Sequence, residues 1–181
     1  MKVVQTPLAE VLLIEPAVFG DSRGYFMETW NAERFRQAGI AEEFVQDNQS
    51  RSLRGVLRGL HYQEPNPQGK LVRCPRGALF DVAVDIRRGS PTFGRHVTAL
   101  VSAENWRQVY VPVGFAHGFV TLEPNTEVLY KVSAFYSPQH ERGIRWNDPA
   151  LGIAWGVRDG EVVVSPRDLH HPPLASAQDL F

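Results

Sequence analysis

The chain has 181 residues, of which 43% are hydrophobic and 22% are charged, and these values predict one compact domain, residues 1–181, with a sizeable core. Nineteen Lys and Arg residues against twenty Asp and Glu residues give a net charge of −1, so overall charge gives no support for binding nucleic acid or an anionic membrane surface. The single cysteine, Cys74, excludes an internal disulfide and a multi-cysteine zinc site.

The N-terminal segment has apolar patches that Gln5, Pro7 and Glu10 interrupt. It lacks the apolar stretch and the small-residue cleavage site of a signal peptide. No apolar run in the sequence approaches the roughly 20 residues of a membrane span. We therefore expect a cytoplasmic protein with no membrane partner.

The first expected elements are a short strand over Val11–Glu15 and one helix. Asn31 can cap a helix over Ala32–Ala38, and Gly39 stands where that helix would end.

The rest of the chain has the pattern of strands. Apolar and polar residues alternate over Ala78–Arg87, with Asp81 and Asp85 on the polar face, which predicts a half-buried strand. A second clear strand is expected over Thr126–Tyr136, with Tyr130 and the terminal tyrosine on one face. Gly and Pro punctuate these segments at short intervals, which favours an all-β sandwich or barrel. The shorter expected strands are Val56–Tyr62, Lys70–Arg73, Val97–Val101, Val109–Val111, Gly118–Leu122 and Glu161–Val164.

One turn in the sequence resembles a metal-binding motif. The segment from Pro112 to His117 has the pattern Pro-x-Gly-x-x-His, which resembles the second motif of cupins, whose histidine often binds metal. The partner motif would be His-x-His, but His61 is followed by Gln63 at the second position. Two histidines and one possible carboxylate make an incomplete metal shell, so no metal is expected. A hydrogen-bonded turn histidine explains His117 equally well.

Without a metal, His61 still suits proton transfer from a carbon acid, because a neutral imidazole accepts protons near physiological pH. Arg58 lies three positions earlier, and an ideal strand would point the two side chains to opposite faces. Either Gly59 marks a bulge that re-aims one of them, or the two residues do not share a pocket.

Other polar side chains allow two interpretations each. Tyr130 and Tyr136 can be packed core residues, or a buried phenol can donate a proton to a carbanion. Lys70, Arg73 and Arg76 can form a solvated edge. Alternatively, Lys70 and Arg58 supply fixed positive charge for an enolate oxygen or a diphosphate.

Taken together, segments along nearly the whole chain resemble the dTDP-4-dehydrorhamnose 3,5-epimerase family, and they follow the family's order. Each segment alone is a weak signal, whereas the set is specific. The matching segments are Val18–Glu28, Phe44–Ser50, Gly55–Gln63, Gln68–Arg73, Phe80–Arg87, Gly89–Gly94, Tyr110–Phe119, Leu129–Lys131 and Glu141–Pro149.

The resemblance implies a cupin-like jelly-roll β-barrel with a few short helices. It also implies conversion of dTDP-4-dehydro-6-deoxy-D-glucose, a dTDP-4-keto-6-deoxyhexose, to dTDP-4-dehydro-L-rhamnose through enolates, as a step toward dTDP-L-rhamnose. No hydride moves, so no cofactor is expected. By the resemblance, His61 is the general base and Asp168 its carboxylate partner. Tyr130 is the acid on the opposite face, and Lys70 lies near the C4 oxyanion.

The resemblance further implies a homodimer that exchanges strands, with parts of each site coming from the neighbour. The family commonly has lysine where this chain has Arg167, which keeps the charge and changes its geometry. The expected contacts to the sugar nucleotide are Phe19, Arg23, Glu28, Gln46, Asn48, Arg58, His117, Tyr136, Glu141 and Arg167.

Three alternatives stay open from the sequence. A mono-epimerase of a related deoxysugar pathway would share most of these motifs. A metal-dependent cupin oxygenase is disfavoured by Gln63. A non-catalytic cupin that binds sugars would show binding without proton exchange.

Overall fold

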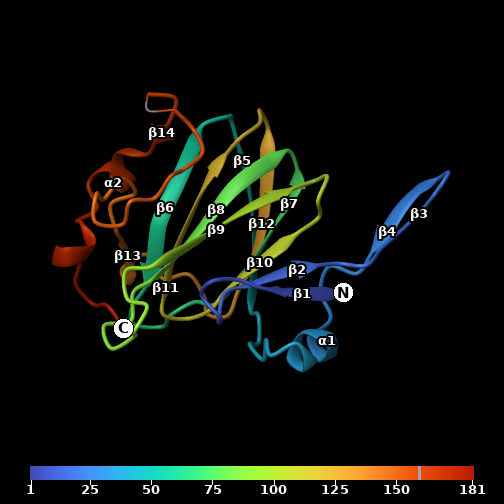
Figure 1. Cartoon of the computed structure of the whole chain (residues 1–181), viewed down its shortest axis with the longest axis horizontal. Helices are drawn as coiled ribbons and strands as arrows, with labels where there is room; N and C mark the ends of the chain where they lie inside the picture. Colours follow the sequence, from blue (N-terminus) through green and yellow to red (C-terminus); the bar gives the residue numbers. More distant parts are fainter. Residues whose placement is uncertain (159) are drawn as a thin grey trace.

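The computed structural model describes residues 1–158 and 160–181. Two antiparallel β-sheets face each other and form a jelly-roll barrel (Figure 1), which confirms the expected fold class. The first sheet has six strands in the order β1-β2-β10-β7-β12-β5. Their bounds are β1 Lys2–Gln5, β2 Leu12–Glu15, β5 Gln46–Ser52, β7 Lys70–Arg76, β10 Gln108–Val111 and β12 Thr126–Val132.

The second sheet has the order β13-β6-β11-β8-β9, and the short strand β14 pairs in parallel with β6. The other neighbours in this sheet are antiparallel. The bounds are β6 Val56–Gln63, β8 Ala78–Asp85, β9 His96–Ser102, β11 Phe115–Thr121, β13 Glu141–Gly143 and β14 Val163–Val164.

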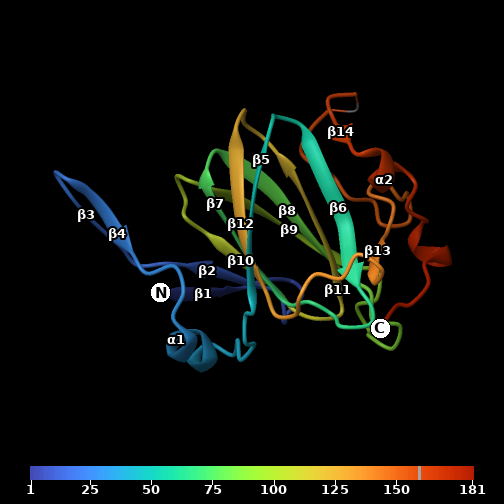
Figure 2. The same cartoon turned by 180° about the vertical axis from the view of Figure 1, so that it is seen from behind.

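A hairpin of β3 (Val18–Asp21) and β4 (Gly24–Met27) projects away from the barrel in both views (Figures 1 and 2). Helix α1 spans Ala32–Gln37, as expected. The side chain of Asn31 accepts a hydrogen bond from an N–H of the first turn, which caps the helix. Two further short helical elements near the C-terminus are α2 (Pro166–Leu169) and a 3-10 turn over Leu174–Ser176. Of the helices described, none has the length and apolar character needed to cross a membrane.

The core forms in three clusters. The first lies between the sheets and includes Val72 and Leu79. The second covers the outer face of the second sheet, where Trp155 of the C-terminal segment packs near Val82 and Val84. In the third, Phe35 of α1 packs with residues of β2, β7 and β10. The C-terminal segment therefore buries a sheet face that a simple barrel would expose to water.

The expectation that Ala78–Arg87 is half-buried is wrong. Strand β8 is buried on both faces, and Asp85 on its polar face is 0% exposed. Asp85 accepts hydrogen bonds from Arg87, Ser90 and Thr92, so its charge is compensated inside the protein. The alternation is real, but the polar positions point into the barrel rather than to solvent.

The strand expected over Thr126–Tyr136 ends at Val132, so Tyr136 lies outside it and does not share a strand face with Tyr130. Strand β5 has no counterpart among the expected strands. Its sequence, QDNQSRS, is entirely polar, and strands are recognised by apolar alternation. Its burial nevertheless alternates, because one face lines a cavity that needs polar groups.

Candidate active site

A cavity of about 650 Å³ lies in the barrel and is lined by residues of both sheets. Strands β5, β7 and β12 of the first sheet contribute one wall, and β6, β11 and β13 of the second sheet contribute the other. The short helix α2 adds residues at the edge. This cavity contains all four expected catalytic residues, His61, Lys70, Tyr130 and Asp168. It also contains seven of the expected substrate contacts: Gln46, Asn48, Arg58, His117, Tyr136, Glu141 and Arg167.

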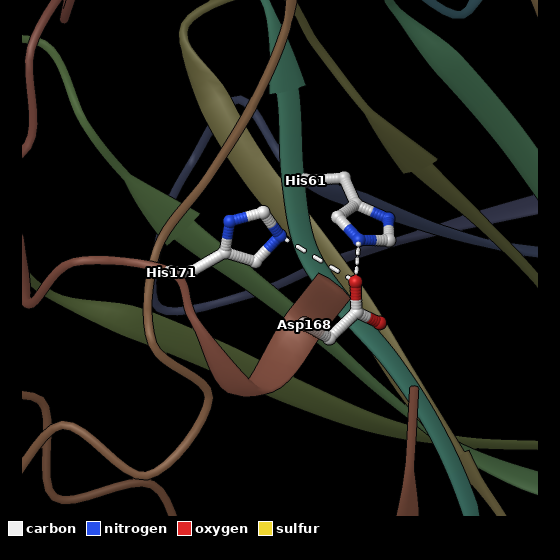
Figure 3. Close-up of side chains that lie close together, drawn as sticks. All are labelled: His61, Asp168 and His171. Atoms are coloured by element: carbon white, nitrogen blue, oxygen red, sulfur yellow. Dashed lines mark hydrogen bonds and ion pairs between the residues drawn. The ribbon is translucent and has the colours of Figure 1, made fainter. Parts of the chain in front are cut away.

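His61 and Asp168 form a hydrogen-bonded pair although 107 positions separate them in the chain. The distance from His61 Nε2 to Asp168 Oδ1 is 2.8 Å (Figure 3). An ionised carboxylate only accepts hydrogen bonds, so the proton lies on Nε2 and the lone pair of the neutral ring lies on Nδ1. Nδ1 is 4.0 Å from Glu141 Oε1. Nδ1 is therefore the nitrogen that can accept a proton.

Asp168 is held in place by its own helix and by β6. Ser165 caps α2 by accepting a hydrogen bond from the backbone N–H of Asp168, and the Gly59 N–H donates to Asp168 Oδ2 at 3.2 Å. Burial raises the pKa of the Asp168 carboxyl, but the close contacts with His171 and His61 and the hydrogen bond from the Gly59 N–H outweigh it and hold that pKa well below its usual range. Asp168 is thus ionised at neutral pH and places a negative charge beside His61.

A bulge in β6 brings Arg58 and His61 to the same cavity. His61 pairs with His117 of β11 and Arg58 pairs with Phe119, so β6 carries one extra residue between the two pairs. Gly59 has φ +128°, and a Cβ atom there would lie 2.5 Å from the Gly118 Cα. The bulge requires glycine. Of the two alternatives left open by strand periodicity, it supports the one in which Gly59 re-aims a side chain and Arg58 and His61 share a pocket.

Lys70 and Tyr130 contribute opposite kinds of group to the cavity. Lys70 is 8% exposed, and its Nζ donates to the His61 carbonyl at 3.4 Å. Burial lowers the pKa of Lys70 to about 8, while the charges of Glu141 and Asp81 act in the other direction. Burial raises the pKa of the Tyr130 phenol, so Tyr130 is protonated at neutral pH and can donate a proton.

Four of the remaining cavity residues take part in two further hydrogen-bonded groups: His117 in one, and Tyr136, Glu141 and Arg167 in the other. His117 Nε2 lies 2.8 Å from the buried carboxylate of Asp81, which fits the hydrogen-bonded interpretation of that histidine. Glu141 Oε2 accepts from the Tyr136 hydroxyl at 2.6 Å and pairs with Arg167 at 2.7 Å. Tyr136 is placed here by the loop after β12, not by a strand face.

One group of side chains has donor atoms suited to a metal ion. Ligand atoms of His61, Asp168 and His171 all lie within 4.8 Å of one another, and two imidazoles with a carboxylate are a donor set that Zn²⁺ accepts. However, the 2.8 Å contact between His61 and Asp168 has the length of a hydrogen bond, so a metal ion at this place would have to displace the proton of that bond. His117 of the cupin-like motif is not in this group.

Three expected contacts lie outside the cavity of their own chain. Phe19 and Arg23 belong to the projecting hairpin, where Phe19 is 67% exposed and Arg23 pairs with Asp21. Glu28 follows the hairpin and pairs with Arg34 at 3.1 Å.

His171 is a residue of the site that strand alternation does not indicate. Its Nε2 lies 3.4 Å from Asp168 Oδ1. The signal available in the sequence is only its closeness to Asp168, three positions earlier, because His171 lies past the end of α2.

Comparisons with known proteins agree with the geometry. A family model described as dTDP-4-dehydrorhamnose 3,5-epimerase matches residues 5–176. The dTDP-4-dehydrorhamnose 3,5-epimerase of Pseudomonas aeruginosa is 53% identical over 178 residues, which are 98% of each chain.

Solved structures of related epimerases have the same fold. The dTDP-6-deoxy-D-glucose-3,5-epimerase of Legionella pneumophila, in complex with dTDP-4-keto-L-rhamnose, has a TM-score of 0.94 at 46% identity, over 97% of this chain and 93% of that chain. A 3'-monoepimerase of Streptomyces bikiniensis, in complex with dTDP-quinovose, has a TM-score of 0.88 at 39% identity, over 94% and 87%.

Proposed function

The chain belongs to the dTDP-4-dehydrorhamnose 3,5-epimerase family, and from this premise we propose roles for the residues of its cavity. It is a carbohydrate epimerase that converts dTDP-4-dehydro-6-deoxy-D-glucose to dTDP-4-dehydro-L-rhamnose. In such a 4-keto sugar, the C3 and C5 hydrogens are acidic because loss of either gives an enolate with its charge on the C4 oxygen. The reaction needs a base, a positive group at that oxygen and a proton source on the opposite face.

His61 is the base in this proposal, and its hydrogen bond to Asp168 is the observation that carries it. The 2.8 Å bond fixes the Nε2 proton and leaves Nδ1 free to accept one from C3 or C5. The anionic Asp168 then stabilises the imidazolium that forms. Positioned bases of this kind contribute about 10²- to 10⁴-fold in rate.

Lys70 and Tyr130 supply the other two requirements. Lys70 is buried, and a fixed positive charge in a cavity that excludes water stabilises an oxyanion more than it would in bulk solvent. Tyr130 comes from the sheet opposite to that of His61, so a sugar between the sheets would have a base on one face and an acid on the other.

The remaining substrate contacts follow from the same placement. Arg58 and Arg167 offer guanidinium groups in the cavity that suit the diphosphate. Phe19 and Arg23 extend from the body of the chain, which fits a homodimer in which each hairpin reaches the neighbour's cavity. The cytoplasmic location expected from the sequence stays a prediction.

Proton exchange tests the proposal. The protein is incubated in deuterated water with dTDP-4-keto-6-deoxyglucose, without added metal or nicotinamide, and NMR follows C3 and C5. Deuterium at both carbons is expected. His61→Asn should abolish the exchange, whereas His170→Asn, which changes an exposed neighbour of the site, should not.

Each other outcome identifies an alternative. Exchange at one carbon indicates a mono-epimerase. Binding without exchange indicates a sugar-binding cupin, and activity that a chelator removes indicates a metal enzyme.

A further inference from the structure

A second imidazole contacts the carboxylate of the proposed His61–Asp168 pair. His171 follows α2, and its Nε2 lies 3.4 Å from Asp168 Oδ1, the same oxygen that His61 contacts (Figure 3). The rings of His61 and His171 meet edge to face, with centroids 5.6 Å apart. His171 is not among the residues that line the substrate cavity, so it acts on the reaction through its contacts with Asp168 and His61.

The surroundings of His171 fix its ring in this position. The Nε2 atom is shielded from solvent, and among the described residues it has no partner in ordinary hydrogen-bond geometry. Its contact with Asp168 is therefore an electrostatic one at 3.4 Å. The ring lies against the Cα of Gly143. A Cβ atom at that position would come within 2.5 Å of three ring atoms. Gly143 is in β13, directly opposite His61 in the β6 register. Strand β13, which pairs with β6 at His61, therefore also provides the space for the His171 ring, because it has glycine at position 143.

The protonation of this ring follows from its neighbour. If Nε2 carried a lone pair, that lone pair would face an anionic oxygen in a buried place, which is unfavourable. A proton on Nε2 instead makes the contact attractive. At 3.4 Å it is longer than an ordinary N–H···O bond, so it orients the carboxylate without displacing the 2.8 Å bond from His61.

We propose that His171 is a positioning residue: its Nε2–H holds Asp168 Oδ1 toward His61, so that the base keeps Nδ1 aimed at the sugar. The inference rests on the proposed function, since it assigns a partner to the base of that reaction. In metal sites, residues that orient a histidine through its hydrogen-bond partner contribute about 10- to 100-fold in affinity or activity, and we expect an effect of that size here.

Substitutions at position 171 separate positioning from simple packing. His171→Ala should lower kcat about tenfold or more and change KM by less than about twofold, because the substrate contacts remain. His171→Gln should recover part of kcat, since its amide N–H reaches as Nε2–H does. His96→Ala is the matched control and should behave as the wild type, because His96 lies in β9, whose residues do not line the cavity.

Gly143→Ala tests the same contact from the other side. The added methyl group displaces the His171 ring, so kcat should fall as it does in His171→Ala. In the double variant His171→Ala/Gly143→Ala the ring is absent, and the loss should equal that of one single variant rather than the product of both.

A spectroscopic readout on the free protein makes the test independent of the proposed function. In the wild type, the Nε2–H proton of His61 should be protected from exchange with water in the NMR spectrum. This signal should broaden in His171→Ala and return in His171→Gln. Failure of the proposed function appears as a wild type that exchanges no deuterium into the sugar, whatever the state of this signal.

Two results would overturn the positioning role. One is an unchanged kcat and an unchanged His61 signal in His171→Ala. The other is an equal loss in His171→Ala and His171→Gln with the His61 signal intact.

Discussion

The positive charge of Lys70 is destabilised by burial, which lowers the pKa of this lysine from the usual 10.5 to about 8. As pH rises through about 8, Lys70 loses its proton and can no longer stabilise an oxyanion by charge. We expect kcat/KM to fall with rising pH on the alkaline side near pH 8, since this parameter reports groups of the free enzyme. The arginine of Lys70→Arg stays charged throughout this pH range. We therefore expect the variant to have a lower kcat/KM than the wild type, without the fall near pH 8.

The deprotonation of Lys70 should affect stability in the direction opposite to its effect on activity. Between about pH 8 and 10.5 the unfolded chain holds the lysine proton and the folded chain does not. The free energy of unfolding therefore rises with pH over this window. Urea unfolding of wild type and Lys70→Met measures the difference. A Lys70→Met variant with the same pH dependence as the wild type would show that Lys70 is not the group responsible.

Asp168 makes its contribution through charge as well as position. Asp168→Asn keeps the shape of the side chain but removes the anion beside the imidazolium, so kcat should fall about 10²- to 10⁴-fold. Deuterium exchange at C3 and C5 measures the loss. Asp179→Asn, which changes a partly exposed carboxylate paired with Arg142, serves as the control. A loss of less than about twofold in Asp168→Asn would contradict the role of the pair.

At the scale of one element, the bulge in β6 places the base and Arg58 together. Gly59→Ala puts a methyl group 2.5 Å from the Gly118 Cα and 2.9 Å from the His117 carbonyl oxygen, at a positive φ. Overpacking of this kind costs about 1–3 kcal/mol, and the backbone strain adds to it. Urea unfolding should show the loss of stability together with lost exchange activity.

Gly89→Ala is the control for this change, because no atom lies within 4 Å of the added methyl group. It should unfold at the same urea concentration as the wild type. If Gly59→Ala also unfolds there with full activity, the bulge does not position the base.

The elements also show how far sequence patterns reach. Apolar alternation correctly predicts β2, β6 and β9, because each has a face on the core. It says nothing about β5, whose polar side chains line the cavity, and it assigns Asp85 to solvent. Both errors have one cause: alternation identifies two faces of a strand but not what covers each face. The C-terminal segment covers the outer face of β8, and a cavity covers one face of β5.

Sequence patterns also predict only part of the candidate site. Local sequence places His61 and Gly59 on one strand, and the bulge follows from an option that the pattern leaves open. The approach of Asp168 depends on the path of the C-terminal segment across the second sheet, and this path comes from packing rather than from local pattern. Only the resemblance to the family brings Asp168 to His61 before the fold is known.

For the whole molecule, the projecting hairpin is the feature that the single chain leaves unexplained. Its Phe19, Tyr25 and Phe26 are all more than half exposed, although the Tyr25 ring lies near Trp106 with the ring centroids 5.2 Å apart. A two-stranded hairpin is marginally stable alone in water, and exposed aromatic clusters mark interaction surfaces. A second copy of the chain would cover this surface, and Arg23 would then lie in the partner's cavity.

Mixed dimers test this arrangement directly. His61→Ala and Arg23→Ala should each be inactive as homodimers. If Arg23 completes the neighbour's site, a dimer of one copy of each variant has one site that lacks both groups and one site that is intact. Co-expression with two different tags should therefore restore about a quarter of wild-type activity, because about half of the dimers are mixed and each has one working site. Purified mixed dimers with no activity would place Arg23 in the site of its own chain.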